Sequence, residues 1–108
     1  SNACPGVYFS GSSNMALHDN LFIRNGWAPR SGMANADTHV SVNASSGINI
    51  TGNTFKAAAD FDVRAPRYGI IGDVMTNCVI QGNTFSGAAT DRNIQTNHDT
   101  NTGCAISE

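Results

Sequence analysis

The chain has 108 residues, a formal net charge of −2 and 13% charged residues. This charge gives no basic stripe of the kind that follows phosphates, so we expect no nucleic-acid partner. The longest apolar run is far shorter than a membrane span, and we expect no membrane partner. Frequent Gly, Asn, Ser and Thr are typical of a β protein rather than of charged helices or an acidic tail.

The start of the chain predicts a piece of something larger. Ser1, Asn2 and Ala3 resemble a cloning scar, and a repeat register begins almost directly after them. We therefore expect residues 4–108 to be a single β-helical unit from the C-terminal part of a longer protein. Stacked repeats usually need polar caps, so we expect self-association or contact with missing upstream coils.

Three segments, residues 7–22, 40–55 and 70–85, align without a gap over sixteen positions, at offsets of 33 and 30. A fixed period of this size indicates a solenoid. The aligned columns are Val7/Val40/Ile70, Met15/Ile48/Cys78, Leu17/Ile50/Ile80, Asn20/Asn53/Asn83 and Phe22/Phe55/Phe85.

Apolar residues lie two apart within each segment, which is the period of a strand with one face inward. Segments rich in turn-forming residues are predicted to separate two strands of each repeat, at 11–14, 44–47 and 73–77. A third strand is predicted at 61–63 and 93–95. Each repeat then forms one turn of a three-sided coil, with strands stacked in parallel about 4.8 Å apart. Residues 103–106 are predicted to start a fourth coil, with Cys104 under Ile70.

The Asn and Phe columns predict an architectural role. Asn tolerates the left-handed backbone of a sharp corner, and amides stacked one coil apart form a hydrogen-bonded ladder. A buried Phe contributes about 1.5–3 kcal/mol, so a Phe stack would be a main source of stability. The predicted ladder and stack are Asn20, Asn53, Asn83, Phe22, Phe55 and Phe85.

Residues 48–55 and 78–85, INITGNTF and CVIQGNTF, resemble coils of the right-handed parallel β-helix of the pectate-lyase-like superfamily. This resemblance covers about residues 6–106 and implies an all-β, right-handed solenoid of about three to four coils. The superfamily includes polysaccharide lyases, glycoside hydrolases, alginate epimerases and phage tailspike depolymerases. An extracellular, cell-surface or virion location is implied as well. Because the matching residues are architectural, they specify the fold and leave the chemistry open.

The resemblance implies a C-terminal segment of a carbohydrate-active protein that binds an extracellular polysaccharide or supports the catalytic coils. Catalytic groups on this fold usually lie in central coils, so we expect little or no activity from this chain alone. The alternative is a non-catalytic structural, adhesive or oligomerisation solenoid. An antiparallel sandwich with Gly-Asn hairpin turns is a third interpretation, which the regular spacing disfavours.

Candidate sugar contacts are charged and aromatic residues outside the apolar columns. Asp60, Asp62 and Arg64 alternate with apolar residues and are predicted to face outward, with a solvated surface pair as the alternative interpretation. Two carboxylates about 5–9 Å apart would suit glycoside hydrolysis, although the catalytic residues stay unassigned. The candidate substrate-binding residues are Asp60, Asp62, Arg64, Arg67, Tyr68, Arg92 and Trp27. No metal site and no cofactor is assigned, with a carboxylate-bound Ca²⁺ as an alternative.

The cysteines and histidines give no metal-site spacing. Cys78 and Cys104 are interpreted as small buried hydrophobes, with one disulfide among Cys4, Cys78 and Cys104 as the alternative. Surface positions are predicted for His18, His39 and His98.

Overall fold

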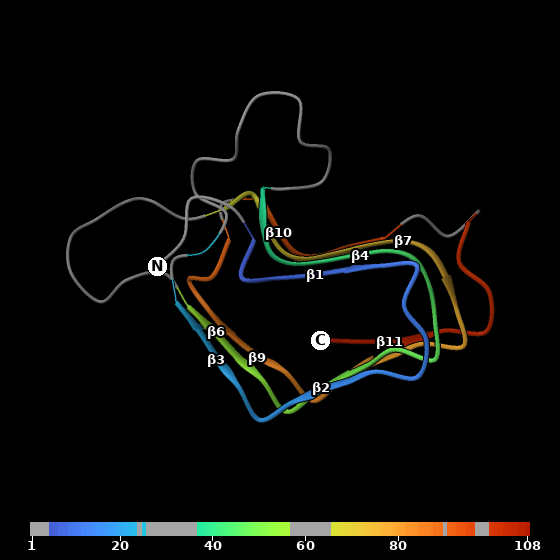
Figure 1. The fold of residues 1–108 in the computed structure, drawn as a ribbon. Coiled ribbons are helices and arrows are strands. Elements are labelled where there is room, and N and C mark those ends of the chain that lie inside the picture. Colours follow the sequence, from blue (N-terminus) through green and yellow to red (C-terminus); the bar gives the residue numbers. More distant parts are fainter. Residues whose placement is uncertain (1–4, 24, 26–36, 57–65, 90, 97–99) are drawn as a thin grey trace.

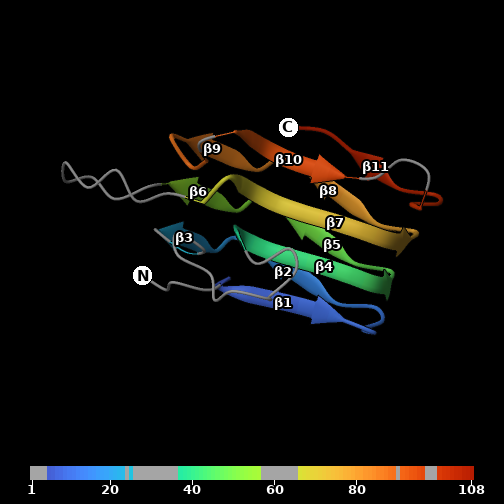
Figure 2. The ribbon, with the colours of Figure 1, turned by 90° about the horizontal axis from the view of Figure 1, so that it is seen from above.

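The computed structural model describes residues 5–23, 25, 37–56, 66–89, 91–96 and 100–108. Within these ranges every regular element is a strand, and the strands form three sheets in which all pairings are parallel. Figure 1 looks along the stack and shows the sheets as the sides of a coil. Figure 2 shows the coils lying one above another.

Each sheet collects the equivalent strand of successive coils. The first sheet has the order β1 (Val7–Ser10), β4 (Thr38–Ser46), β7 (Tyr68–Thr76) and β10 (Arg92–Thr96). The second is β2 (Ala16–His18), β5 (Asn49–Thr51), β8 (Val79–Gln81) and β11 (Ala105–Ile106). The third is β3 (Leu21–Ile23), β6 (Thr54–Lys56) and β9 (Thr84–Ser86).

The strand register follows the sequence columns. Val40 pairs with Val7 on one side and with Ile70 on the other, and Phe55 pairs with Phe22 and Phe85 in the same way. The prediction of an all-β chain with parallel strands stacked coil on coil is confirmed.

The third side of the coil differs from the prediction. It is formed by the Asn-x-Phe segments themselves, in β3, β6 and β9. Residues 93–95 form a strand, but this strand is part of β10 in the first sheet, with Ile94 next to Ile70. Cys104 therefore lies one coil beyond Cys78 and not under Ile70. The reason for the different position is a shorter third coil: equivalent residues are 24 apart in the first sheet, as for Arg67 and Asp91, and 26 apart at Cys78 and Cys104, rather than 33 or 30. The other predicted third strand, 61–63, lies outside the described residues.

The expected turns at 44–47 and 73–77 do not interrupt the first sheet. β4 and β7 continue through Ser46 and Thr76, and the pairing resumes at Ser45 with Met75. Inside these strands, Ala44 and Val74 adopt left-handed φ angles of 48° and 53°, and Gly47 and Asn77 do so directly after the strands end, at 65° and 52°. A single left-handed residue bends a strand without ending its ladder.

The corner before each ladder Asn is also different from the prediction. The left-handed residues there are Asp19, Gly52 and Gly82, with φ angles of 57°, 66° and 66°, and not the Asn residues that follow them. A Cβ on Gly52 would lie 2.6 Å from Oδ1 of Asp19. The Asp19 side chain therefore occupies the space that a side chain at position 52 would need, and a glycine is required there.

Amide hydrogen bonds and stacked rings connect the coils, as the sequence predicts. The backbone N–H and Nδ2 of Asn20 donate to Oδ1 of Asn53, at 2.9 and 3.1 Å, and Asn53 donates to Asn83 at the same distances. The Phe55 ring stacks on Phe22 and Phe85 with centroids 4.9 and 5.0 Å apart. Both columns therefore run along the stack.

The buried core lies between the three sheets. It consists of Phe9, Phe22, Val40, Val42, Ile48, Ile50, Phe55, Ile70, Met75, Cys78, Ile80 and Ala88. Met15 belongs to a core column by sequence but is 45% exposed, because it lies in the outermost coil.

A disulfide joins Cys78 to Cys104, across 26 residues. It connects the third coil to the fourth, next to the pairing of β8 with β11. Cys78 is buried in the core as predicted and Cys104 packs against that core, but the two are bonded to each other, so the alternative of one disulfide applies. Cys4 lies outside the described residues.

Candidate functional site

Charged and aromatic side chains gather where two neighbouring strands of the first sheet begin. We define the strand-start cluster as Arg67, Tyr68, Asp91 and Arg92. The backbone N–H groups of Asp91 and Arg92 donate to the carbonyl of Arg67, at 2.9 and 3.1 Å, and Arg92 pairs with Tyr68 in the strand register. The solenoid thus brings residues 24 positions apart in the sequence side by side.

Arg67 lies at the centre of this cluster. Its Nη2 is 3.3 Å from Oδ2 of Asp91, and its Cζ is 5.1 Å from the centroid of the Tyr68 ring. Its backbone N–H donates to Oδ1 of Asp37 at 3.0 Å, which ties the cluster to the coil before. The Arg67 and Asp91 side chains are 59% and 43% exposed, so the ion pair adds little stability but stays accessible to a ligand.

The cluster contains three of the predicted sugar-contact residues. Arg67, Tyr68 and Arg92 come together, and Arg92 is steadied by a hydrogen bond from Nη1 to Oε1 of Gln95 at 3.3 Å. The other predicted contacts lie outside the described residues: Asp60, Asp62, Arg64 and Trp27. The part of the site that the structure describes offers an aromatic face, guanidinium donors and an ion-paired carboxylate, which is a set suited to binding polar ligands.

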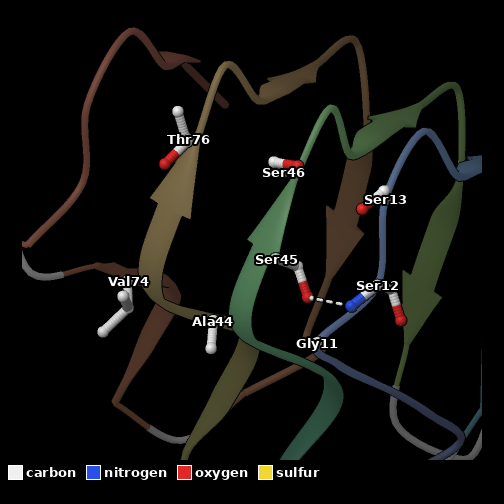
Figure 3. Close-up of a pocket in the computed structure, with 8 residues that line it drawn as sticks. All are labelled: Gly11, Ser12, Ser13, Ala44, Ser45, Ser46, Val74 and Thr76. Carbon is white, nitrogen blue, oxygen red and sulfur yellow. Dashed lines mark hydrogen bonds between the residues drawn. The ribbon is translucent and has the colours of Figure 1, made fainter.

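A second surface feature is a shallow hollow of about 260 Å³ at the bend of the first sheet (Figure 3). We call it the hydroxyl groove. Its lining residues are Gly11, Ser12, Ser13, Ala44, Ser45, Ser46, Val74 and Thr76. Ser45 is held by two hydrogen bonds, one from the N–H of Ser12 at 3.1 Å and one to the carbonyl of Asn43 at 2.9 Å.

The hydroxyl groove was not predicted from the sequence. Ser13, Ser46, Thr76 and Thr102 are neighbours on successive coils, so their hydroxyls form a column along the stack. The signal was present, because Ser13, Ser46 and Thr76 share a column of the repeat alignment. Small polar residues in these segments favoured a turn interpretation instead.

His39 is fully buried, so its predicted surface position is wrong. Its Nε2 donates to the carbonyl of Ala88 at 2.9 Å, Nδ2 of Asn25 lies 3.5 Å from Nδ1, and the Phe55 ring is 5.7 Å away. The neighbouring coils have Gly6 and Gly69 at the equivalent position, where a Cβ would lie 3.1 Å from the Asn25 side chain and 2.8 Å from the Phe85 ring, respectively. His18 is exposed as predicted and lies 3.0 Å from Asp19, while His98 lies outside the described residues.

Burial gives His39 a pH-dependent effect on stability. Desolvation lowers the pKa of His39 below its usual value of 6.5, partly opposed by its hydrogen bond with the Ala88 carbonyl. The unfolded chain therefore binds this proton more readily than the folded chain. We expect the free energy of unfolding to fall as the pH drops below about 6.5, by up to about 1.4 kcal/mol per pH unit, until the lowered pKa is passed.

Urea unfolding at pH 8 and pH 5.5 measures this effect. We expect His39→Gln, which keeps an amide donor, to flatten the difference in the free energy of unfolding between the two pH values. An equal pH dependence in the His39→Gln variant would show that another group is responsible.

The described residues contain no group of three or more His, Cys, Asp or Glu side chains placed to hold a metal ion. No helix long and apolar enough to cross a membrane occurs among them.

No family model, curated protein or solved structure matches the chain. The fold and the site define the class by themselves: an all-β protein of stacked parallel coils with a charged and aromatic cluster exposed on one side.

Proposed function

We propose that this chain is a right-handed parallel β-helix of the pectate-lyase-like type, and that it is the C-terminal segment of a carbohydrate-active protein. In this role it binds an extracellular polysaccharide or supports the catalytic coils of a lyase, hydrolase or tailspike depolymerase. Three parallel sheets, a ladder of Asn amides and an internal Phe stack support this assignment.

The observation that carries the binding proposal is the strand-start cluster. The Tyr68 ring offers a flat face for a sugar ring, and the guanidinium groups of Arg67 and Arg92 offer several donors for hydroxyl or carboxylate oxygens. Asp91 and Gln95 each hold one of these guanidinium groups. Binding then orders fewer side chains, which reduces its entropic cost.

Together with Asp37, the strand-start cluster extends along the stack axis. Asp37, Arg67 and Asp91 lie on successive coils and are linked by hydrogen bonds or an ion pair. A polymer lying along this axis would meet polar groups at intervals of one coil, about 4.8 Å. An extended glycan is the type of ligand that such a row fits.

An extracellular, cell-surface or virion location is part of the proposal. The disulfide between Cys78 and Cys104 supports it, because disulfides persist in oxidising compartments and are rare in the cytosol.

A structural or adhesive solenoid is the second candidate function. It is favoured by large apolar side chains exposed on the first coil: Tyr8 at 53%, Met15 at 45%, Leu21 at 58% and Ile23 at 39%. Exposed apolar side chains on neighbouring strands are typical of surfaces that contact other proteins.

Titration calorimetry with a panel of neutral and uronate-containing polysaccharides tests the binding proposal. We expect one class to bind, and expect Arg67→Ala and Tyr68→Ala each to weaken it about tenfold or more, a change of about 1.4 kcal/mol. Tyr8→Ala is the matched control, since Tyr8 is an exposed Tyr of the same sheet in another coil. The structural solenoid would be favoured if no polysaccharide binds, or if Arg67→Ala and Tyr68→Ala bind as tightly as the unmodified chain.

A further inference from the structure

The formal charges of the strand-start cluster and of Asp37 cancel. The two positive charges are those of Arg67 and Arg92. Two carboxylates offset them, and both contact residue 67. Oδ2 of Asp91 lies 3.3 Å from Nη2 of Arg67, and Oδ1 of Asp37 accepts the Arg67 backbone N–H at 3.0 Å. The described charged groups at this site therefore present no net positive charge to a ligand.

The backbone determines where Asp91 lies. Its N–H donates to the carbonyl of Arg67 at 2.9 Å, and the next residue, Arg92, pairs with Tyr68 in the strand register. Asp91 and Arg67 are therefore neighbours on adjacent coils, and this neighbourhood does not depend on the charge of the Asp91 side chain. A substitution at position 91 can remove the charge while these backbone hydrogen bonds stay in place.

The ion pair of Arg67 and Asp91 offers hydrogen-bond donors and acceptors side by side. The guanidinium only donates, and an ionised carboxylate only accepts. Both side chains are accessible, at 59% and 43% exposed. A sugar hydroxyl donates and accepts, so neighbouring hydroxyls of a neutral sugar can bond to the guanidinium and to the carboxylate at the same time.

A sugar carboxylate fits the same ion pair poorly. Because it only accepts hydrogen bonds, it gives no donor to Asp91 and competes with Asp91 for the Arg67 guanidinium. It also brings a second negative charge close to the Asp91 carboxylate, and like charges placed together at an interface disfavour binding. The arrangement around Arg67 therefore favours a neutral ligand over an acidic one.

We propose that Asp91 is a specificity-determining residue, and that it makes the strand-start cluster select neutral, hydroxyl-rich glycans over uronate-containing ones. This inference rests on the polysaccharide binding proposed above and names its substrate class. Specificity depends on a group that penalises the wrong ligand as well as on contacts with the right one. Since both side chains of the ion pair are partly exposed and their charges are screened, we expect a preference of about tenfold.

Asp91→Asn is the variant that tests this assignment. Asparagine has nearly the same shape, and its Oδ1 can still accept a hydrogen bond from Nη2 of Arg67, but it carries no charge. Asp19→Asn is the matched control. It removes the same charge from an aspartate whose side chain is 79% exposed, at the corner between β2 and β3. Circular dichroism verifies that both variants are folded.

Titration calorimetry with matched pairs of polymers is the measurement. The probes are polygalacturonate, alginate and hyaluronate, each in its native form and after reduction of its carboxylates to alcohols, together with the neutral polysaccharides of the panel. We expect the unmodified chain to bind at least one reduced polymer about tenfold more tightly than its native form. We expect Asp91→Asn to remove most of this difference by binding the native form more tightly, and Asp19→Asn to keep it.

Salt provides a second readout that a purely structural role of Asp91 would not change. At about 1 M salt the screening length is about 3 Å, so we expect the gain of Asp91→Asn for native polymers to shrink. Tighter binding of a native form by the unmodified chain, or an unchanged ratio in Asp91→Asn, would overturn the assignment of Asp91 and leave polysaccharide binding in place. If neither chain binds any polymer, both proposals are overturned.

Discussion

Phe55→Ala is expected to lower the free energy of unfolding by about 3–5 kcal/mol. The Phe55 side chain is fully buried and is the middle ring of the stack, 4.9 Å from the Phe22 centroid and 5.0 Å from that of Phe85. His39 closes a further side at 5.7 Å. Truncation removes the contacts on all these sides and leaves a cavity that three coils share, so a small shift of one neighbour cannot fill it.

Urea unfolding followed by far-ultraviolet circular dichroism measures this loss. Tyr8→Ala is the control, because Tyr8 is also aromatic but 53% exposed, and we expect it to change the free energy of unfolding by less than about 1 kcal/mol. Similar small losses for both variants would mean that the Phe column does not carry the core.

Asn53→Ala is expected to cost about 2–4 kcal/mol, the second largest effect. Asn53 is 1% exposed and connects three coils. Its Nδ2 donates to the carbonyl of Leu17 at 2.8 Å and to Oδ1 of Asn83, and its Oδ1 accepts from the backbone N–H and Nδ2 of Asn20. Alanine removes the acceptor of the Asn20 backbone N–H and the side-chain donor to the Leu17 carbonyl, whereas Oδ1 of Asn83 keeps the backbone N–H of residue 53. Each buried polar group left unpaired costs about 1–3 kcal/mol.

Asn20→Ala is the matched control for the ladder. Asn20 has the same place in its coil but is exposed and bonds to one neighbouring ladder residue only, so water can replace part of what is lost. We expect thermal unfolding to show a clearly smaller decrease in Tm for Asn20→Ala than for Asn53→Ala. Equal decreases would show that burial of the ladder does not determine its contribution.

The sequence predicted the columns well because each coil returns the same side chain to the same place. Val40 and Val42 alternate with polar residues and are buried in the core, and the same holds for Ile48 and Ile50. Apolar residues two positions apart are the pattern by which such a strand is recognised in a sequence. The third side gave a weaker pattern, since each of its strands has one inward Phe and no second apolar residue two positions away. The shorter offset to the fourth coil was also hidden, because the Asn-x-Phe marker is not repeated there.

The least predictable residues were those with no similar side chain at the equivalent position of the neighbouring coils. His39 lies between Gly6 and Gly69, so nothing in the alignment marked it as buried. For the candidate site, a coiled chain explains why Arg67 and Asp91 meet, but the sequence could not show that Asp91 holds the Arg67 guanidinium at 3.3 Å. That contact depends on the length of one coil, which only the backbone path determines.

The parallel pairing has a consequence for the order in which the molecule forms. Ladder partners are 33 and 30 residues apart, and no described strand pairs with its immediate neighbour in the chain. Each contact therefore requires the chain to complete a full circuit first, and the entropy of closing that loop is lost before any pairing offsets it. A stack of this kind forms slowly at its first closure and more readily afterwards, since every later coil folds against an edge that already exists.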